Sequence, residues 1–238
     1  MNHAAQLPAV ADFRAQHESG CFVLPNPWDV GTAVYLQHLG FKALATTSAG
    51  FAFSRGKPDG GVLLDEMLSH ISEIVAATSL PVNADFLNGF ADEPEDISTN
   101  VKLCIECGVA GLSIEDNSQN SAAPLYEEKL AVDRIRAARE AIDASGVPVV
   151  LTGRCEAWLV KAPDPFRVAI DRLVAYAEAG QLADLGVRRI SVGSGLAAVA
   201  WEAFISAARS IATTGRFDDA FAKAVPTAEL NETFSERN

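Results

Sequence analysis

Amphipathic segments alternate with short, continuous apolar runs along most of the chain. The pattern is clearest in four places, where a helical segment ends in glycine and an apolar run follows: residues 39–50, 107–116, 145–154 and 185–195. Gly40, Gly108, Gly146 and Gly186 stand where a residue in left-handed geometry closes a helix. Two further strands are expected at residues 22–25 and 81–85, which gives six strands in all.

Helices are expected between these strands, at residues 30–38, 63–78, 94–107, 127–144, 164–179 and 196–213. The strand runs are apolar throughout rather than alternating, which is typical of parallel strands buried on both faces. A parallel α/β fold follows, either a barrel or an open sheet. The segment after the first strand, LPNPWDVG, has no glycine-rich phosphate loop, so an open-sheet nucleotide-binding protein is disfavoured and the barrel preferred. At 238 residues, one domain over residues 1–238 is expected.

Charge and composition narrow the possible partners and compartment. The net charge of −12 disfavours nucleic acid, because its phosphates would be repelled. No apolar run is long enough to span a membrane and no secretion signal is evident, so a cytoplasmic protein is expected. The four cysteines are too few for a disulfide framework. Cys104 and Cys107 form a C-x-x-C pair within an expected helix, where packing is favoured over zinc binding.

Polar residues gather at the ends of the expected strands, where barrel enzymes carry their active sites. Asp85 and Glu115 are carboxylates that a buried site tolerates only with a compensating cation, and Mg²⁺ suits so sparse an oxygen ligand set. Arg154 would supply a forked donor for a substrate carboxylate, which Ser48 and the Gly50 backbone could hold from the other side. The alternative is that Asp85, Glu115 and Arg154 form only an ion-pair network at the barrel rim. Outside this group, Trp28 could line the pocket or simply pack.

Five segments, in this order along the chain, together resemble the motifs of a known enzyme family: NPWDVGTA, ATTSAGFAFSRGKPDG, LPVNADFLNGFAD, GVAGLSIEDN and VLTGR. They resemble the strand-end motifs of the isocitrate lyase/phosphoenolpyruvate mutase superfamily, and the resemblance resumes at LADLGVRRISVGSGLA. It implies that Ser48 and Gly50 bind the substrate carboxylate, and Trp28, just past a strand end, is expected to line the same pocket. It also implies that Asp85 is the principal Mg²⁺ ligand. The catalytic set would be Arg154, which grips substrate oxygens, with Asp59 and Glu115, which hold metal-bound waters.

The resemblance also implies an activity. Such an enzyme is a Mg²⁺-dependent carbon–carbon lyase or phosphonomutase-like enzyme that cleaves or forms a C–C or P–C bond of a small 2-oxo or carboxylic acid through an enolate. Family members commonly form dimers or tetramers by exchanging a terminal helix, so a homo-oligomer built on residues 196–212 and 217–224 is expected, with packing on the chain's own barrel as the alternative. The polar segment from Glu229 to the end is expected to fray.

Three departures from the family pattern qualify this activity. Where the family has a second acid after the metal-binding aspartate, this chain has Leu87, with Asn88 as a substitute only if the loop shifts. The lyases' K-K-C-G-H loop is replaced by NSQN after Asp116, and the lysine of the mutase's gating loop is missing as well. The second candidate function is therefore a catalytically inactive protein that keeps Ser48, Asp85 and Arg154 as a carboxylate-binding pocket.

A further and larger departure lies near Gly180, where one helical segment runs into the next without a strand. A complete (β/α)8 TIM barrel needs eight strands, so the sequence predicts a barrel that lacks about two βα units at this point. Such a deletion would leave sheet edges exposed unless the strands close again or a second chain covers the gap.

Overall fold

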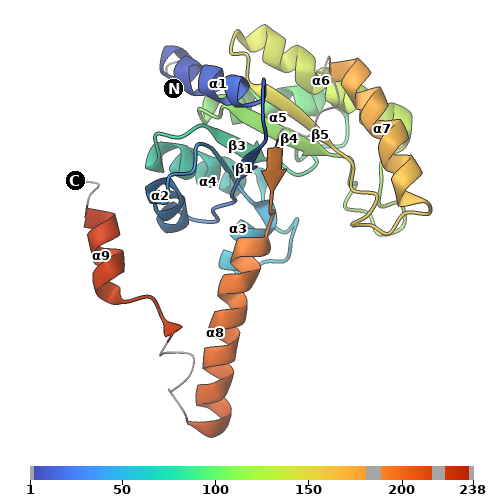
Figure 1. Ribbon diagram of the computed structural model, residues 1–238. Coiled ribbons are helices and arrows are strands. Elements are labelled where there is room, and N and C mark those ends of the chain that lie inside the picture. Colours follow the sequence, from blue (N-terminus) through green and yellow to red (C-terminus); the bar gives the residue numbers. More distant parts are fainter. Residues whose placement is uncertain (1–2, 181–188, 216–222, 236–238) are drawn as a thin grey trace.

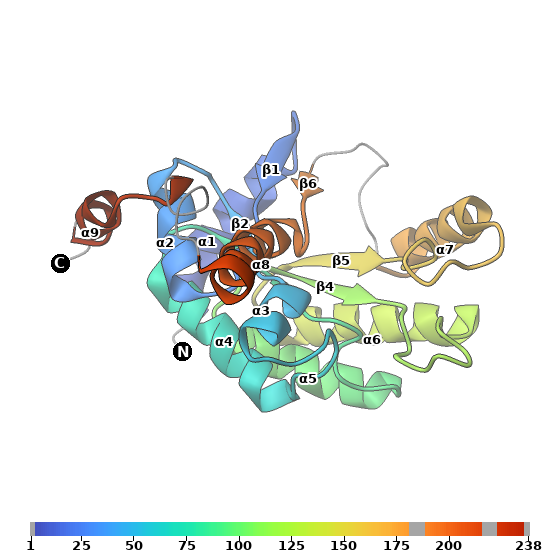
Figure 2. The same cartoon turned by 90° about the horizontal axis from the view of Figure 1, so that it is seen from below.

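The computed structural model describes residues 3–180, 189–215 and 223–235. Six parallel strands lie in this part of the chain: β1 (Phe22–Leu24), β2 (Leu44–Ala45), β3 (Val82–Asp85), β4 (Gly111–Glu115), β5 (Val150–Arg154) and β6 (Arg189–Ser191). They alternate with helices along the chain, and several of these helices line the outer side of the strands (Figures 1 and 2). The predicted parallel α/β architecture is confirmed.

The strands form two sheets that continue into one another. The larger sheet has the order β2-β3-β4-β5, and β1 pairs with β6 in the smaller one. The two meet where the Ala45 backbone N–H donates to the Pro25 carbonyl at 3.0 Å, and where the Asn26 side chain donates to the Thr46 carbonyl and accepts from the Val192 backbone N–H. The sequence of neighbours is therefore β6-β1-β2-β3-β4-β5. Among the described strands, β5 and β6 have no ladder between them.

The nine described helices are α1 (His3–Gln16), α2 (Val30–His38), α3 (Ser48–Ser54), α4 (Leu64–Ala77), α5 (Pro94–Glu106), α6 (Glu128–Ser145), α7 (Pro165–Gly180), α8 (Gly195–Thr214) and α9 (Thr227–Ser235). Six of them match the predicted helices, whereas α1, α3 and α9 were not predicted. The expectation that the segment from Glu229 frays is wrong for residues up to Ser235, because α9 lies against α2 and the Tyr35 hydroxyl donates to Glu229 at 3.1 Å.

Three of the four predicted helix-ending glycines adopt the left-handed backbone: φ is +84° at Gly40, +91° at Gly108 and +72° at Gly146. Gly186 lies outside the described residues. Cys104 and Cys107 are both buried and belong to the main hydrophobic core, and the Cys107 thiol faces the Leu68 carbonyl at 3.5 Å. The packing role predicted for this pair is confirmed. No helix in the described ranges is long and apolar enough to cross a membrane.

Helix α1 fills the amino-terminal end of the strand array with Phe13, which is fully buried. A Cβ atom on Gly111 of β4 would lie 2.7 Å from the Phe13 ring, 2.8 Å from the Asn83 side-chain oxygen and 3.0 Å from the Val150 carbonyl. We therefore expect Gly111→Ala to lower the free energy of unfolding by about 2 kcal/mol, as overpacking of a filled core does. Urea denaturation checks this, with Gly195→Ala as a control for the change of residue type, because a Cβ atom on Gly195 would lie no nearer than 3.7 Å to its closest neighbour, Val192. A loss as small as that of the control would contradict the close packing.

His70 of α4 stacks on Phe51 of α3, with ring centroids 3.9 Å apart. The imidazole is 3% exposed, and within the described residues its Nε2 atom has no hydrogen-bond partner. Burial lowers the pKa of His70 to about 4, against a smaller opposing effect of Asp29. The contact between α3 and α4 therefore depends on a neutral histidine.

Because the pKa of His70 is lower in the folded chain than in the unfolded one, its contribution to stability is complete above pH 6.5 and is lost as the pH falls towards 4. At pH 5 the expected loss is about 2 kcal/mol. Urea denaturation at pH 7.5 and pH 5 of the wild type and of His70→Phe measures it. An equal loss in both proteins would show that other groups cause the acid sensitivity.

Helix α8 extends away from the strands into solvent (Figure 1). Of its residues only Ala197 is buried, while Val199 and Phe204 are 70% and 62% exposed. On the other side of the molecule, Trp158 and Phe166 near the start of α7 are similarly exposed and meet edge to face. Large exposed apolar patches on a soluble chain mark surfaces that pack against another partner.

Candidate active site

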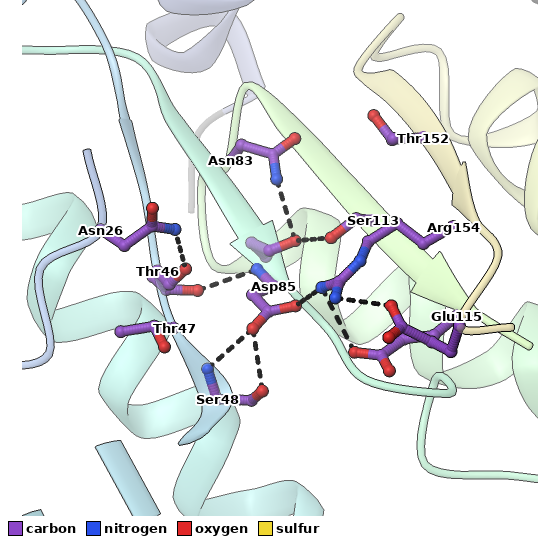
Figure 3. Close-up of polar contacts among 12 residues, drawn as sticks. Asn26, Thr46, Thr47, Ser48, Asn83, Asp85, Ser113, Glu115, Thr152 and Arg154 are labelled. Carbon is purple, nitrogen blue, oxygen red and sulfur yellow. Dashed lines mark hydrogen bonds and ion pairs between the residues drawn. The ribbon is translucent and has the colours of Figure 1, made fainter. Parts of the chain in front are cut away.

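Asp85 lies at the carboxyl end of β3, at the centre of a cluster of polar side chains (Figure 3). One carboxylate oxygen accepts from the backbone N–H and the hydroxyl of Ser48, both at 2.8 Å. The other oxygen accepts from Arg154 at 2.7 Å. The Asp85 backbone N–H is bonded to the Thr46 hydroxyl at 2.9 Å. The Asp85 side chain is therefore held in place by its strand, by Ser48 and by Arg154.

Arg154, at the end of β5, brings three carboxylates together. Its Nη1 atom lies 2.7 Å from Asp85 and 3.3 Å from Glu115, and its Nη2 atom lies 2.6 Å from Glu156. Burial disfavours the charge on Arg154, but these carboxylates outweigh burial and raise the pKa of its guanidinium. The Arg154 side chain is 39% exposed, whereas those of Asp85 and Glu115 are 13% and 6% exposed. The arginine is thus the solvent-facing member of the cluster.

Ser48 begins helix α3, and Thr47 caps that helix by accepting from the Gly50 backbone N–H at 3.1 Å. A Cβ atom on Gly50 would lie 2.6 Å from the Thr47 side chain and 3.1 Å from Trp28, so this position requires glycine. Trp28 lies beside Gly50 and also lines an apolar hollow of about 220 Å³ together with Ser54 and the start of α8. Sequence analysis had grouped Ser48, Gly50 and Trp28, and the structure brings them together.

The carboxylates crowd one another electrostatically. Burial raises the pKa of Glu115, and Asp85, Glu156 and Asp59 raise it further against the opposing effect of Arg154. Asp59 lies on the exposed loop before α4. Even so, the surrounding protein partly removes its carboxyl group from water, and this desolvation raises the pKa of Asp59. The negative charge of Asp85 raises it further. Oxygen ligands with excess negative charge suit a hard divalent cation such as Mg²⁺. Within the described residues, no group of three or more acidic, histidine or cysteine side chains is placed to hold a metal ion.

Leu87 and Asn88 follow the site aspartate in a tight turn. Leu87 is buried and has a φ of +48°, a backbone conformation that disfavours a branched apolar residue. The Asn88 side chain donates to the Tyr126 hydroxyl at 2.9 Å and accepts from the Phe90 backbone N–H at 3.1 Å. In this conformation the Asn88 side chain is engaged by Tyr126 and Phe90, so replacement of the missing acid by Asn88 would still require the loop to shift and stays a prediction.

Asp116, next to Glu115, points to the outer side of the strands. One of its oxygens accepts from the Glu156 backbone N–H at 2.8 Å. The other accepts from Arg172 at 3.0 Å and from the Tyr176 hydroxyl at 2.8 Å, both residues of α7. All four residues are buried. Helix α7 is therefore fastened by a buried charge to the strand ends that carry the cluster.

With this geometry established, comparison with known proteins places the chain in a family. The family model for phosphoenolpyruvate phosphomutase matches residues 13–181, which is well over half of the chain. The chain belongs to the phosphoenolpyruvate mutase/isocitrate lyase superfamily. All of the polar cluster described above lies within the matched residues, and the superfamily resemblance predicted from the sequence is confirmed.

Several members of this superfamily are similar over long stretches. A solved structure from Burkholderia cenocepacia J2315, classed provisionally as a lyase/mutase, is 38% identical with a TM-score of 0.92 and covers 98% of this chain and 99% of its own. An uncharacterised Mycobacterium tuberculosis protein is 28% identical over 251 residues, covering 90% of this chain and 92% of its own length. The 2-methylisocitrate lyase of Escherichia coli K12 is 37% identical, but the match covers 62% of this chain and 51% of the lyase.

Phosphonopyruvate hydrolase, solved with oxalate and Mg²⁺, shares the fold with a TM-score of 0.80 at 18% identity over 96% of this chain. The superfamily fold is TIM-barrel-like, and its members with known activities are lyases, mutases and hydrolases of small acids.

Two parts of the site were not assigned from the sequence. Glu156 follows Arg154 by two residues, and because side chains alternate along a strand, this spacing could have indicated that both face the same side. Asp116 was given no role from the sequence. Its role in fastening α7 depends on Arg172 and Tyr176, which are distant in sequence and carry no local signal.

Proposed function

We propose that this chain is a Mg²⁺-dependent enzyme that cleaves or forms a C–C or P–C bond of a small 2-oxo or carboxylic acid through an enolate. The observation that carries the proposal is the cluster in which Asp85, Glu115 and Arg154 meet the amino terminus of α3 at the strand ends. Members of the superfamily act on small carboxylic acids, and solved structures of phosphonopyruvate hydrolase and oxaloacetate acetylhydrolase contain oxalate. Oxalate has the shape and charge of a pyruvate enolate.

Each residue has a proposed part. Asp85 is the direct Mg²⁺ ligand, and Asp59 and Glu115 accept hydrogen bonds from waters of the bound cation. Mg²⁺ would supply positive charge beside the substrate oxygen on which negative charge develops. Arg154 binds the same side of the substrate through its exposed guanidinium.

The other end of the substrate is assigned to α3. Ser48 offers two donors, its backbone N–H and its hydroxyl, and in this structure both donate to Asp85. Gly50 has no side chain, as the close contact of its backbone with Thr47 and Trp28 requires. Trp28 is proposed to border this carboxylate-binding side. Since Asp85 accepts from Ser48 and from Arg154 at once, the donors for a substrate carboxylate are already gathered around one anion.

The alternative function is a catalytically inactive protein that binds 2-oxo acids with the same residues. Leu87 favours it, because the turn after Asp85 offers an apolar side chain where a second acid would add to the cation site. The two functions differ in turnover and share the binding step.

We also propose that the chain is a single domain built as a (β/α)8 barrel that lacks about two βα units after α7. Three observations support this. The sheets β6-β1 and β2-β3-β4-β5 meet through the Ala45–Pro25 backbone hydrogen bond, and no ladder joins β5 to β6 among the described residues. The family match ends at residue 181. The alignment with the mycobacterial relative runs over 251 residues, more than this whole chain, although it takes in only 90% of it, so the relative has positions without a counterpart here.

A homo-oligomer, dimer or tetramer, is proposed from the exposed side chains of α8. A helix with a single buried residue gains little stability from its own chain, and helix packing against a second copy would bury Val199 and Phe204. Sedimentation of the purified protein measures the assembly state. A monomer at micromolar concentration would contradict this proposal.

Isothermal titration with oxalate, with and without Mg²⁺, tests the proposed site. We expect binding in the presence of Mg²⁺ and at least tenfold weaker binding in its absence, because oxalate and the cation share one charge-compensated site. Binding of that kind justifies measuring turnover of oxaloacetate, phosphonopyruvate and substituted malates, which separates the enzyme from the inactive binder. A folded protein that binds no oxalate in either condition would overturn both functions.

A further inference from the structure

Glu156 is the one carboxylate of the cluster without a proposed part in binding. Its side chain is 9% exposed and lies 2.6 Å from Nη2 of Arg154, on the opposite end of the guanidinium from Asp85. The two ends of the fork therefore have different partners. Nη1 is shared by Asp85 and Glu115, whereas Nη2 has Glu156.

Glu156 is itself held in place by the backbone. Its N–H donates to Asp116, and the Asp116 backbone N–H in turn donates to the Arg154 carbonyl at 3.1 Å. The second oxygen of Asp116 is bonded to Arg172 and Tyr176 of α7. Arg172 also donates to the Tyr126 carbonyl at 2.6 Å, which ties α7 to the loop before α6. The chain from 154 to 156 is thus fixed on its outer side by buried hydrogen bonds.

The charges give a reason for this arrangement. Asp85 and Glu115 are the carboxylates proposed to face a cation, so their negative charge is shared between that cation and Arg154. Among the described residues, the charge partner of the Glu156 carboxylate is Arg154, and no part in holding the cation is proposed for it. A charge-assisted hydrogen bond from a guanidinium to a buried, backbone-anchored carboxylate fixes the guanidinium plane more firmly than one to a solvent-exposed partner would.

We propose that Glu156 is a positioning residue, which holds Nη2 of Arg154 so that the remaining guanidinium N–H groups face the substrate side, and that Asp116 couples this position to the docking of α7. The consequence for ligand affinity rests on the proposed function. The contact between Glu156 and Arg154 is independent of the proposed function, and its effect on Arg154 can be measured separately.

The first measurement is the reaction of Arg154 with phenylglyoxal, an arginine-specific reagent, followed by mass spectrometry of the digested protein. We expect the labelling rate of Arg154 to rise about tenfold in Glu156→Ala, the effect of losing one hydrogen bond to a charged group, and to stay near the wild-type rate in Glu156→Gln, which keeps an acceptor. Glu140→Ala, an exposed position on α6, is the matched control. Arg134, buried in the same chain, reports unfolding if it becomes labelled.

The second measurement is the titration of the same variants with oxalate and Mg²⁺. We expect about tenfold weaker binding in Glu156→Ala and recovery of most of the affinity in Glu156→Gln. Unchanged labelling of Arg154 in a folded Glu156→Ala protein would overturn the positioning role. Raised labelling with no oxalate binding by the wild type would keep the positioning role and reject the proposed function, so the two failures are distinguishable.

Discussion

Replacing Asp85 with asparagine is expected to weaken Mg²⁺-dependent oxalate binding by at least about a hundredfold, or about 2.7 kcal/mol. Asparagine keeps an oxygen that can accept from Ser48 or Arg154, so the fold around α3 and β5 should persist. It lacks the negative charge that a hard cation requires. Isothermal titration in Mg²⁺ measures the change.

The control for this substitution is Asp143→Asn, which removes a carboxylate that is 67% exposed and pairs with Arg139. It should bind oxalate as the wild type does. If Asp85→Asn retained wild-type affinity in Mg²⁺ while remaining folded, Asp85 would not be a metal ligand. The cluster would then be an ion-pair network at the rim of the strands.

Asp116→Ala is expected to lower the free energy of unfolding by about 3–5 kcal/mol, the range for a buried ion pair that loses one partner. Arg172, 8% exposed, would keep its charge without a carboxylate, and the Tyr176 hydroxyl and the Glu156 N–H would each lose their acceptor. Urea denaturation at pH 7.5 measures the loss.

The double variant Asp116→Ala with Arg172→Met separates charge from packing. Because it removes the uncompensated guanidinium and keeps an apolar chain of similar length, it should recover part of the lost stability. Asp143→Ala, which breaks the exposed pair with Arg139, should cost less than about 1 kcal/mol. A comparable loss in Asp116→Ala and Asp143→Ala would show that the buried network contributes no more than a surface pair.

Much of the site could be predicted because parallel strands bring their carboxyl ends to one edge. Asp85, Glu115 and Arg154 each close a strand, and β3, β4 and β5 are neighbours, so their proximity follows from the strand order alone. The sequence could not indicate that Asp85 would accept from Ser48, because that contact depends on the start of α3, a seven-residue helix with little periodicity.

The missed helices have physical reasons as well. Helix α1 contains Pro8 in its interior, which removes a backbone donor and weakens the sequence pattern, and its place is set by Phe13 reaching Gly111 across the strands. Helix α9 is polar and depends on its contact with α2. In both cases tertiary contacts outweigh local preference.

Because β5 and β6 have no ladder between them among the described strands, the chain also offers at this flank a site at which new strands could be added by protein design. Each of these strands has a neighbour on one side only among the described elements, and both run in the same direction. Two designed strand–helix units inserted after α7, the number that the proposed barrel lacks, would find backbone donors and acceptors at β5 and at β6 and would need parallel pairing alone. Because Asp116 anchors α7 independently of that flank, such a graft could be selected by gain in thermal stability while the cluster around Arg154 stays as it is.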